Sequence, residues 1–176
     1  MPQVVIVAGT GRKVGKTTVA ADIIRRFSNH GVYSVKISSH NHPLQDGLEV
    51  LFREEDFVVS EELSARREKD SSRLLAAGAI KSFYIQVVSG GPLAPFKKVM
   101  SLIPGKSPVV CESPSLATSV IPGALIVVSR LNNVSGGEKR LTLPLTENRY
   151  DISSDRVESG EVIPLAYNKG LFHIAR

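Results

Sequence analysis

Apolar positions along this chain of 176 residues follow two alternating patterns: short runs typical of buried strands, and spaced sets typical of helices. Gln3–Ala8 is almost wholly apolar and rich in β-branched residues, which predicts a strand buried on both faces of a parallel sheet. In Lys16–His30 the apolar side chains recur at helical spacing, and Val32–Ser39 returns to the alternation of a strand. The start of the chain therefore predicts a β–α–β unit of parallel strands.

The centre of the chain is less regular. We interpret His40–Ser60, which contains a proline, a glycine and many acids, as an irregular excursion. Glu61–Ala77 is expected to be helical, with an interruption near Asp70. Beyond it the pattern predicts a helix at Ala94–Ile103 and strands at Phe83–Val88, Pro108–Glu112 and Ala124–Ser129.

After Arg130, short extended pieces alternate with turn residues. Asn168-Lys169-Gly170 separates two such pieces, 163–167 and 171–175, and predicts a terminal hairpin. Together the elements predict an α/β fold with a mostly parallel sheet flanked by helices. The core is expected to span residues 1–130, and a small β-rich C-terminal annex of the same domain to span residues 131–176.

Between the first predicted strand and the first predicted helix lies a glycine-rich loop, residues 9–18, with the sequence Gly-Thr-Gly-Arg-Lys-Val-Gly-Lys-Thr-Thr. This is the setting of a Walker A motif, in which glycines let backbone N–H groups contact phosphate oxygens at the start of a helix. Lys16 would contact the β- and γ-phosphates as a catalytic residue, and the hydroxyl of Thr17 would bind Mg²⁺. We therefore predict a P-loop NTPase that binds its nucleotide through Gly11, Arg12, Lys13, Val14, Gly15, Lys16, Thr17 and Thr18.

The loop departs from the strict Walker A pattern, because Thr10 stands where a glycine is usual and Gly9 comes one position earlier. This form resembles the variant seen in dethiobiotin synthetase and its relatives. The alternative interpretation is a glycine-rich turn between a strand and a helix that binds nothing.

A second magnesium ligand is expected at the carboxyl end of a neighbouring strand, where open α/β sheets bind their ligands. Glu112 ends the predicted strand Pro108–Glu112 and fits that position, so we predict that Thr17 and Glu112 hold the metal. The alternative is that Glu112 is a surface glutamate at the end of a strand.

Two further groups are candidates for ligand contact. His40 and His42 follow the second predicted strand, and their spacing puts both side chains on one face of an extended chain, where they would face a nucleotide or substrate; the alternative is a shared metal. Asp70-Ser71-Ser72-Arg73 predicts the start of a short helix closed by Gly78, with Arg73 on its first turn.

Composition narrows the classes of function. The chain has 22 lysines and arginines against 17 acids, which favours anionic partners such as nucleotide phosphates. It has no tryptophan and no alternation of bases with aromatics, which argues against nucleic-acid binding. A single cysteine, Cys111, excludes an internal disulfide and fits a reducing compartment. We find no targeting or membrane-spanning segment and expect a cytoplasmic protein.

These motifs, in this order, resemble the adaptor family of molybdopterin-guanine dinucleotide biosynthesis, MobB. The resemblance covers about residues 3 to 130 and rests on the glycine-rich loop, the two histidines, Glu112, and the segment Asp70-Ser71-Ser72-Arg73 with Ala77-Gly78-Ala79. The chain differs from the family at Ser39, where the family has lysine, and at Ser113-Pro114, where the family has glycine.

The resemblance implies a protein that binds Mg²⁺ and GTP, with ATP as the alternative nucleotide, and hydrolyses the nucleotide weakly. It also implies a partner nucleotidyltransferase, a molybdopterin-type ligand and a homodimer. Arg73 is then the catalytic candidate beside Lys16. Two rival hypotheses stay open: an ATP-dependent ligase or kinase of the dethiobiotin-synthetase type, and a non-catalytic module that uses a nucleotide as a switch.

Overall fold

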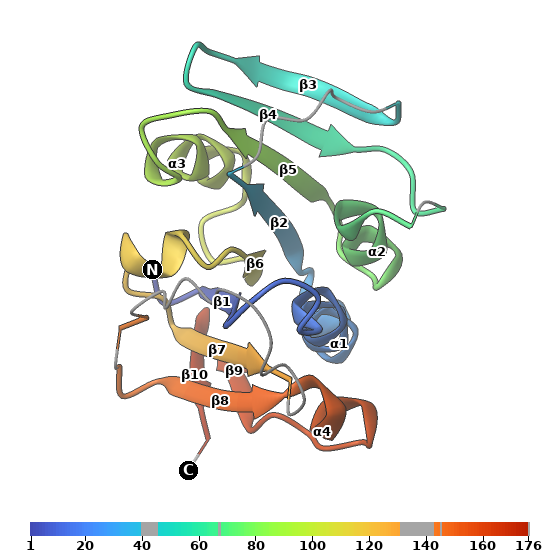
Figure 1. The fold of residues 1–176 in the computed structure, drawn as a ribbon, viewed down its shortest axis with the longest axis vertical. Coiled ribbons are helices and arrows are strands. Elements are labelled where there is room, and N and C mark those ends of the chain that lie inside the picture. The colour runs from blue at the N-terminus through green and yellow to red at the C-terminus, as the bar shows by residue number, and fades with distance from the viewer. Residues whose placement is uncertain (40–45, 67, 131–142, 145, 176) are drawn as a thin grey trace.

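The computed structural model describes residues 1–39, 46–66, 68–130, 143–144 and 146–175. Within these residues, eight strands form one sheet in the order β3-β4-β5-β2-β6-β1-β7-β8, with β3 and β8 at its two ends (Figure 1). The strands are β1 (Val4–Gly9), β2 (Tyr33–Ser38), β3 (Leu48–Arg53), β4 (Phe57–Glu62), β5 (Ser82–Val87), β6 (Val109–Glu112), β7 (Ala124–Ser129) and β8 (Arg149–Ser153). Along the part of the sheet ordered β5-β2-β6-β1-β7-β8 all neighbouring strands are parallel, and β4 pairs antiparallel with both β3 and β5. The predicted mostly parallel sheet is confirmed.

Helices cover both faces of the sheet, so the inner strands bury side chains on both sides. Val5 and Val7 of β1 face one core, which also contains side chains of α1 (Lys16–Phe27) and α2 (Asp70–Ala76). Val4 and Ile6 face the other core, shared with α3 (Leu93–Leu102) and the short 3-10 helix Leu116–Thr118. Figure 1 shows α1 and α2 on one side of the strands and α3 on the other.

The order of the strands places β6 between β1 and β2. The predicted β–α–β unit is present, but its two strands are not neighbours, because residues from the middle of the chain return to pair with both. This insertion brings Glu112, the last residue of β6, beside the end of β1 and the glycine-rich loop. The loop and Glu112 therefore lie together at the carboxyl ends of the parallel strands.

The prediction of an irregular excursion over His40–Ser60 is wrong where the structure describes it. β3 and β4 form an antiparallel hairpin that extends the sheet beyond β5. Its acids conceal the strand pattern in the sequence, since Glu49 is exposed at the edge while Phe57 and Val59 are buried. Residues 40–45 lie outside the described residues, so the predictions for His40 and His42 are not tested.

The predicted helix over Glu61–Ala77 is wrong in its first half, because β4 continues to Glu62 and α2 begins only at Asp70. The buried carboxylate of Glu62 accepts hydrogen bonds from the backbone N–H of Ser64 at 3.1 Å and from the hydroxyl of Ser71 at 2.9 Å. These bonds hold the turn that separates strand from helix, and they fix the start of α2.

The C-terminal residues contribute to the main sheet as well as to a hairpin. β8 pairs parallel with β7 at the edge, and α4 (Ser154–Glu158) follows it directly. β9 (Leu165–Asn168) and β10 (Leu171–Ile174) form the predicted terminal hairpin, which packs through Leu165 and Phe172 on the same core as α1. None of the helices in the described part of the chain has the length and apolar character needed to cross a membrane.

Candidate functional site

The glycine-rich loop connects the end of β1 to the start of α1 (Figure 1). Gly15 stands at the N-cap of α1 with a φ of 90°, a left-handed conformation that favours glycine, and a glycine has no side chain with which to cap the helix. The first backbone N–H groups of an α-helix have no partner within the helix and can serve an external acceptor, and the positive end of the helix dipole favours an anion. Val14 is buried in the core and anchors the loop.

Gly9, one position before the glycine of the strict Walker A pattern, stands where a side chain would not fit. A Cβ at this position would lie 2.7 Å from Cγ and Cδ of Lys16 and 2.8 Å from Cγ2 of Val14. The stem of Lys16 therefore passes over Gly9, and its ammonium group donates to the carbonyl of Gly11 at 2.5 Å. Burial lowers the pKa of Lys16, although the carboxylates of Glu112 and Asp70 act in the opposite direction.

Three oxygen-bearing side chains meet at the first turn of α1. Oγ1 of Thr17 lies 2.8 Å from Oε2 of Glu112 and 2.9 Å from Oδ1 of Asp70. A hydroxyl has one hydrogen and can donate it fully to only one of these acceptors. The two carboxylates and the hydroxyl bring negative charge and oxygen atoms of the kind that Mg²⁺ binds to this part of the site.

Lys36 balances this charge. Its Nζ lies 2.9 Å from Oδ2 of Asp70 and also donates to Glu112, the neighbour of Lys36 across the parallel strands β2 and β6. Burial acts to lower the pKa of Lys36, but the two carboxylates outweigh it and the pKa is raised. The same ion pair lowers the pKa of Asp70, against the effect of its own partial burial.

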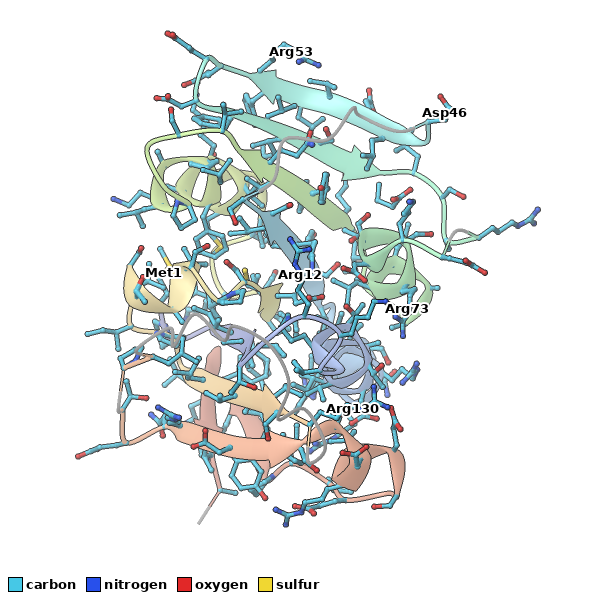
Figure 2. The ribbon with its side chains drawn as sticks, in the orientation of Figure 1. Met1, Arg12, Asp46, Arg53, Arg73 and Arg130 are labelled. Atoms are coloured by element: carbon cyan, nitrogen blue, oxygen red, sulfur yellow. The ribbon has the colours of Figure 1, made fainter. Side chains whose placement is uncertain are left out.

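A cleft of about 530 Å³ opens above these groups. Residues of the loop and of five other segments line it, namely Arg12, Lys13, Val14, Gly15, Lys16, Thr17, Thr18, Lys36, Asp70, Arg73, Glu112, Arg130, Ser154 and Glu158. Figure 2 shows Arg12, Arg73 and Arg130 around the loop that leads into α1, with Arg53 at the far end of the sheet. Six of the lining residues are lysine or arginine and three are acids, so the cleft suits an anionic ligand.

The C-terminal segment forms one wall of this cleft. A Cβ on Gly15 would lie 2.4 Å from Cβ of Ser154, so the start of α4 packs directly on the loop. Nη1 of Arg130 lies 3.5 Å from the carbonyl of Lys13, and Nε of Arg130 lies 3.8 Å from Asp155. The annex predicted for residues 131–176 therefore reaches the candidate site.

The structure brings together most of the predicted site residues. Residues 12–18, Arg73 and Glu112 line one cleft, and Gly11 contributes its carbonyl to Lys16. The surface alternative for Glu112 is wrong, because this side chain is 1% exposed. Arg73 is exposed on α2, with Nη2 3.4 Å from Oγ1 of Thr18.

Five residues that line the cleft were not predicted from the sequence as ligand contacts: Lys36, Asp70, Arg130, Ser154 and Glu158. Lys36 carries a usable signal, since a lysine inside a buried parallel strand needs a charged partner. Asp70 begins α2 as the sequence predicts, and its carboxylate also contacts Thr17 and Lys36, which the sequence did not show.

Comparison of the chain with protein-family models, with curated proteins and with solved structures finds no match. The resemblance to the MobB family therefore stays a prediction from short motifs.

Proposed function

We propose that this protein binds a nucleoside triphosphate with Mg²⁺ in the cleft at the start of α1. The observation that carries the proposal is the position of Thr17, on the first turn of an uncapped helix after a glycine-rich loop, with carboxylates on two sides. Backbone N–H groups of the loop and of α1 would bind the phosphates, and Lys16 would contact the β- and γ-phosphates.

The residues present fit a magnesium ion. One hydroxyl and two carboxylates are hard oxygen ligands, and Mg²⁺ is commonly held by one or two carboxylates together with the phosphates of its nucleotide. Among the described residues no group of three or more His, Cys, Asp or Glu side chains is placed to hold a metal. A magnesium site shared with a nucleotide does not need such a group, because the phosphates supply the other ligands. When bound, the ion would neutralise charge on the β- and γ-phosphates. Thr17, Asp70 and Glu112 would hold it.

We further propose that the protein hydrolyses the nucleotide slowly and presents it, or a molybdopterin-type ligand, to a partner nucleotidyltransferase. GTP is the proposed nucleotide and ATP the alternative, and this preference is supported only by the MobB resemblance. The exposed Arg73 beside the cleft supports a second anionic group close to the phosphates. A homodimer belongs to the same proposal.

One observation favours a second candidate function, phosphoryl transfer to a small molecule as in ligases of the dethiobiotin-synthetase type. Lys36 supplies a second lysine beside the metal ligands and faces the cleft. Phosphoryl transfer is accelerated by cations that meet the charge developing on the transferred group. An enzyme of this kind would turn over at about 1 s⁻¹ or faster once its acceptor is present.

The test is a calorimetric titration of the protein with GTP and ATP, each in Mg²⁺ and in EDTA. We expect saturable binding in Mg²⁺, lost in Lys16→Ala and kept in Lys81→Ala, an exposed lysine whose carboxylate partner is Glu61. Circular dichroism would show that both variants are folded. If the wild-type protein binds neither nucleotide, the proposal is wrong.

A further inference from the structure

Lys36 holds the two carboxylates that the proposed cation would bind. Its ammonium group contacts both Asp70 and Glu112, and Oγ1 of Thr17 contacts the same two carboxylates. We infer that Lys36 is an internal counter-ion, that a divalent cation must displace it, and that the displaced ammonium group then binds the terminal phosphate. This inference rests on the proposed function for its metal and its nucleotide.

The two carboxylates need a cation in every state of the protein. Glu112 is 1% exposed, and Asp70 is close enough to share the hydroxyl of Thr17 with it. Two negative charges at this separation repel strongly in a partly buried site, and burying an unpaired carboxylate is costly. Lys36 provides the balancing charge without metal, because it ion-pairs with both.

Lys36 and a divalent cation would compete for the same two carboxylates. Lys36 contacts Oδ2 of Asp70 and Oε1 of Glu112, while Oγ1 of Thr17 contacts the other oxygen of each carboxylate. An ion held by these three side chains would therefore lie beside the ammonium group, and the two positive charges would repel each other. Lys16, which faces the same cleft and the same carboxylates, adds to the repulsion. The entry of the ion therefore requires the ammonium group of Lys36 to leave.

The fold determines how Lys36 can move. The backbone of β2 pairs with β5 on one side and with β6 on the other, at Lys36↔Tyr84 and Lys36↔Glu112. The strand is held in place, so only the flexible four-carbon side chain can rotate. That side chain lines the cleft, where the γ-phosphate of a nucleotide on the glycine-rich loop would be the nearest new anion.

This exchange couples the two ligands. Without nucleotide, a metal ion gains the carboxylates but leaves Lys36 unpaired, so the metal binds weakly. With a nucleoside triphosphate present, the displaced ammonium group gains a phosphate partner, and metal and nucleotide strengthen each other's binding. A diphosphate lacks the terminal group and gives a smaller gain.

The first experiment measures binding of Mn²⁺ alone, by electron paramagnetic resonance and calorimetry, to the wild-type protein and to Lys36→Met. Removing the competing charge should raise the affinity for Mn²⁺ by about tenfold or more, within the usual range for coupled sites. Lys36→Gln is a second uncharged variant in case the methionine variant does not fold. Lys81→Met is the matched control, because Lys81 does not line the cleft and its Nζ lies 2.9 Å from a carboxylate oxygen of Glu61. The affinity of this variant for Mn²⁺ should equal that of the wild type.

The second experiment compares a non-hydrolysable triphosphate with the diphosphate of the same base, both in Mg²⁺. Lys36→Met should reduce the preference for the triphosphate by about tenfold, because the displaced lysine no longer meets the terminal phosphate. Equal or weaker binding of Mn²⁺ to the folded Lys36 variants would overturn the counter-ion inference and leave Lys36 as a structural ion pair. The first experiment contains no nucleotide, so its result is independent of whether the proposed nucleotide binding is correct.

Discussion

The hydroxyl of Thr17 lies 2.8 Å from the carboxylate of Glu112, although 95 positions separate the two residues in the chain. The contact exists because β6 is inserted next to β1, so that Val7 pairs with Glu112 at the edge of the sheet where the glycine-rich loop begins. Thr17 is fixed by the start of α1 and Glu112 by the end of a buried strand. Two rigid elements therefore hold the oxygens of the proposed metal site.

Glu112→Gln should weaken nucleotide binding much more in Mg²⁺ than in EDTA. The amide keeps the shape of the side chain but loses the charge that holds the ion, and a loss of about tenfold or more is expected, since even the residues behind metal ligands typically contribute about 10–100-fold in affinity. Calorimetry in the two buffers measures the difference. Glu61→Gln, on β4 and paired with Lys81 away from the cleft, is the control. Equal losses in both buffers would instead assign Glu112 to packing.

The local part of the site could be predicted from the sequence. Gly15, Lys16 and Thr17 lie between a β-branched run and an amphipathic helix, and both elements form where the pattern places them. Glu112 was also correctly placed at the end of a buried strand. Each of these predictions depends on residues close together in the chain, where apolar periodicity and glycine positions carry the information.

The remaining part depends on pairings between distant segments. Nothing in the local pattern of β6 reveals that it pairs with both β1 and β2, and this pairing puts Lys36 beside Glu112. Asp70 reaches Thr17 only because the buried Glu62 ends β4 and fixes the turn into α2. Ser154 reaches Gly15 because β8 joins the edge of the sheet. A single sequence does not show such long-range partners.

Gly9→Ala should weaken nucleotide binding by about tenfold or more while costing about 1–3 kcal/mol of stability, the usual range for overpacking. The added methyl group would overlap the stem of Lys16 and Val14, so the ammonium group would shift from its position over the loop. Calorimetry and thermal unfolding measure the two effects. Gly105→Ala is the matched control, because a Cβ there meets nothing within 4 Å. An unchanged affinity in Gly9→Ala would show that the position of the Lys16 stem does not matter.

Cys111 should make the free energy of unfolding fall at alkaline pH. Burial raises the pKa of its thiol in the folded protein, whereas the unfolded chain releases the proton near the ordinary value of 9.0. The folded state binds more protons above that pH, so stability is complete below about pH 9 and decreases as the pH rises, by at most about 1.4 kcal/mol per pH unit. Denaturant titrations of the wild type and of Cys111→Ala measure this slope, which should be shallower in the variant.

The same burial makes Cys111 a probe of opening. The side chain is 0% exposed, on a strand paired on both sides, so a thiol reagent should react only as fast as the protein unfolds locally or globally. Bound Mg²⁺ and nucleotide should slow the reaction further, because they stabilise the neighbouring Glu112 end of β6. Rapid labelling of the folded protein at neutral pH would contradict this prediction.

Arg73→Ala should leave the affinity for Mg²⁺-nucleotide within about twofold of the wild type, as expected for an exposed side chain outside the phosphate-binding loop. It should lower the slow release of phosphate by about tenfold or more, because a cation that meets the charge on the transferred group acts mainly on the rate. A steady-state phosphate-release assay measures the rate, and calorimetry the affinity. Arg53→Ala, at the far end of the sheet in Figure 2, should change neither. Release by the isolated wild-type protein at about ten per second or faster would exclude the slow adaptor, whereas an enzyme that transfers the phosphoryl group to a small molecule would reach about 1 s⁻¹ or faster only once its acceptor is added.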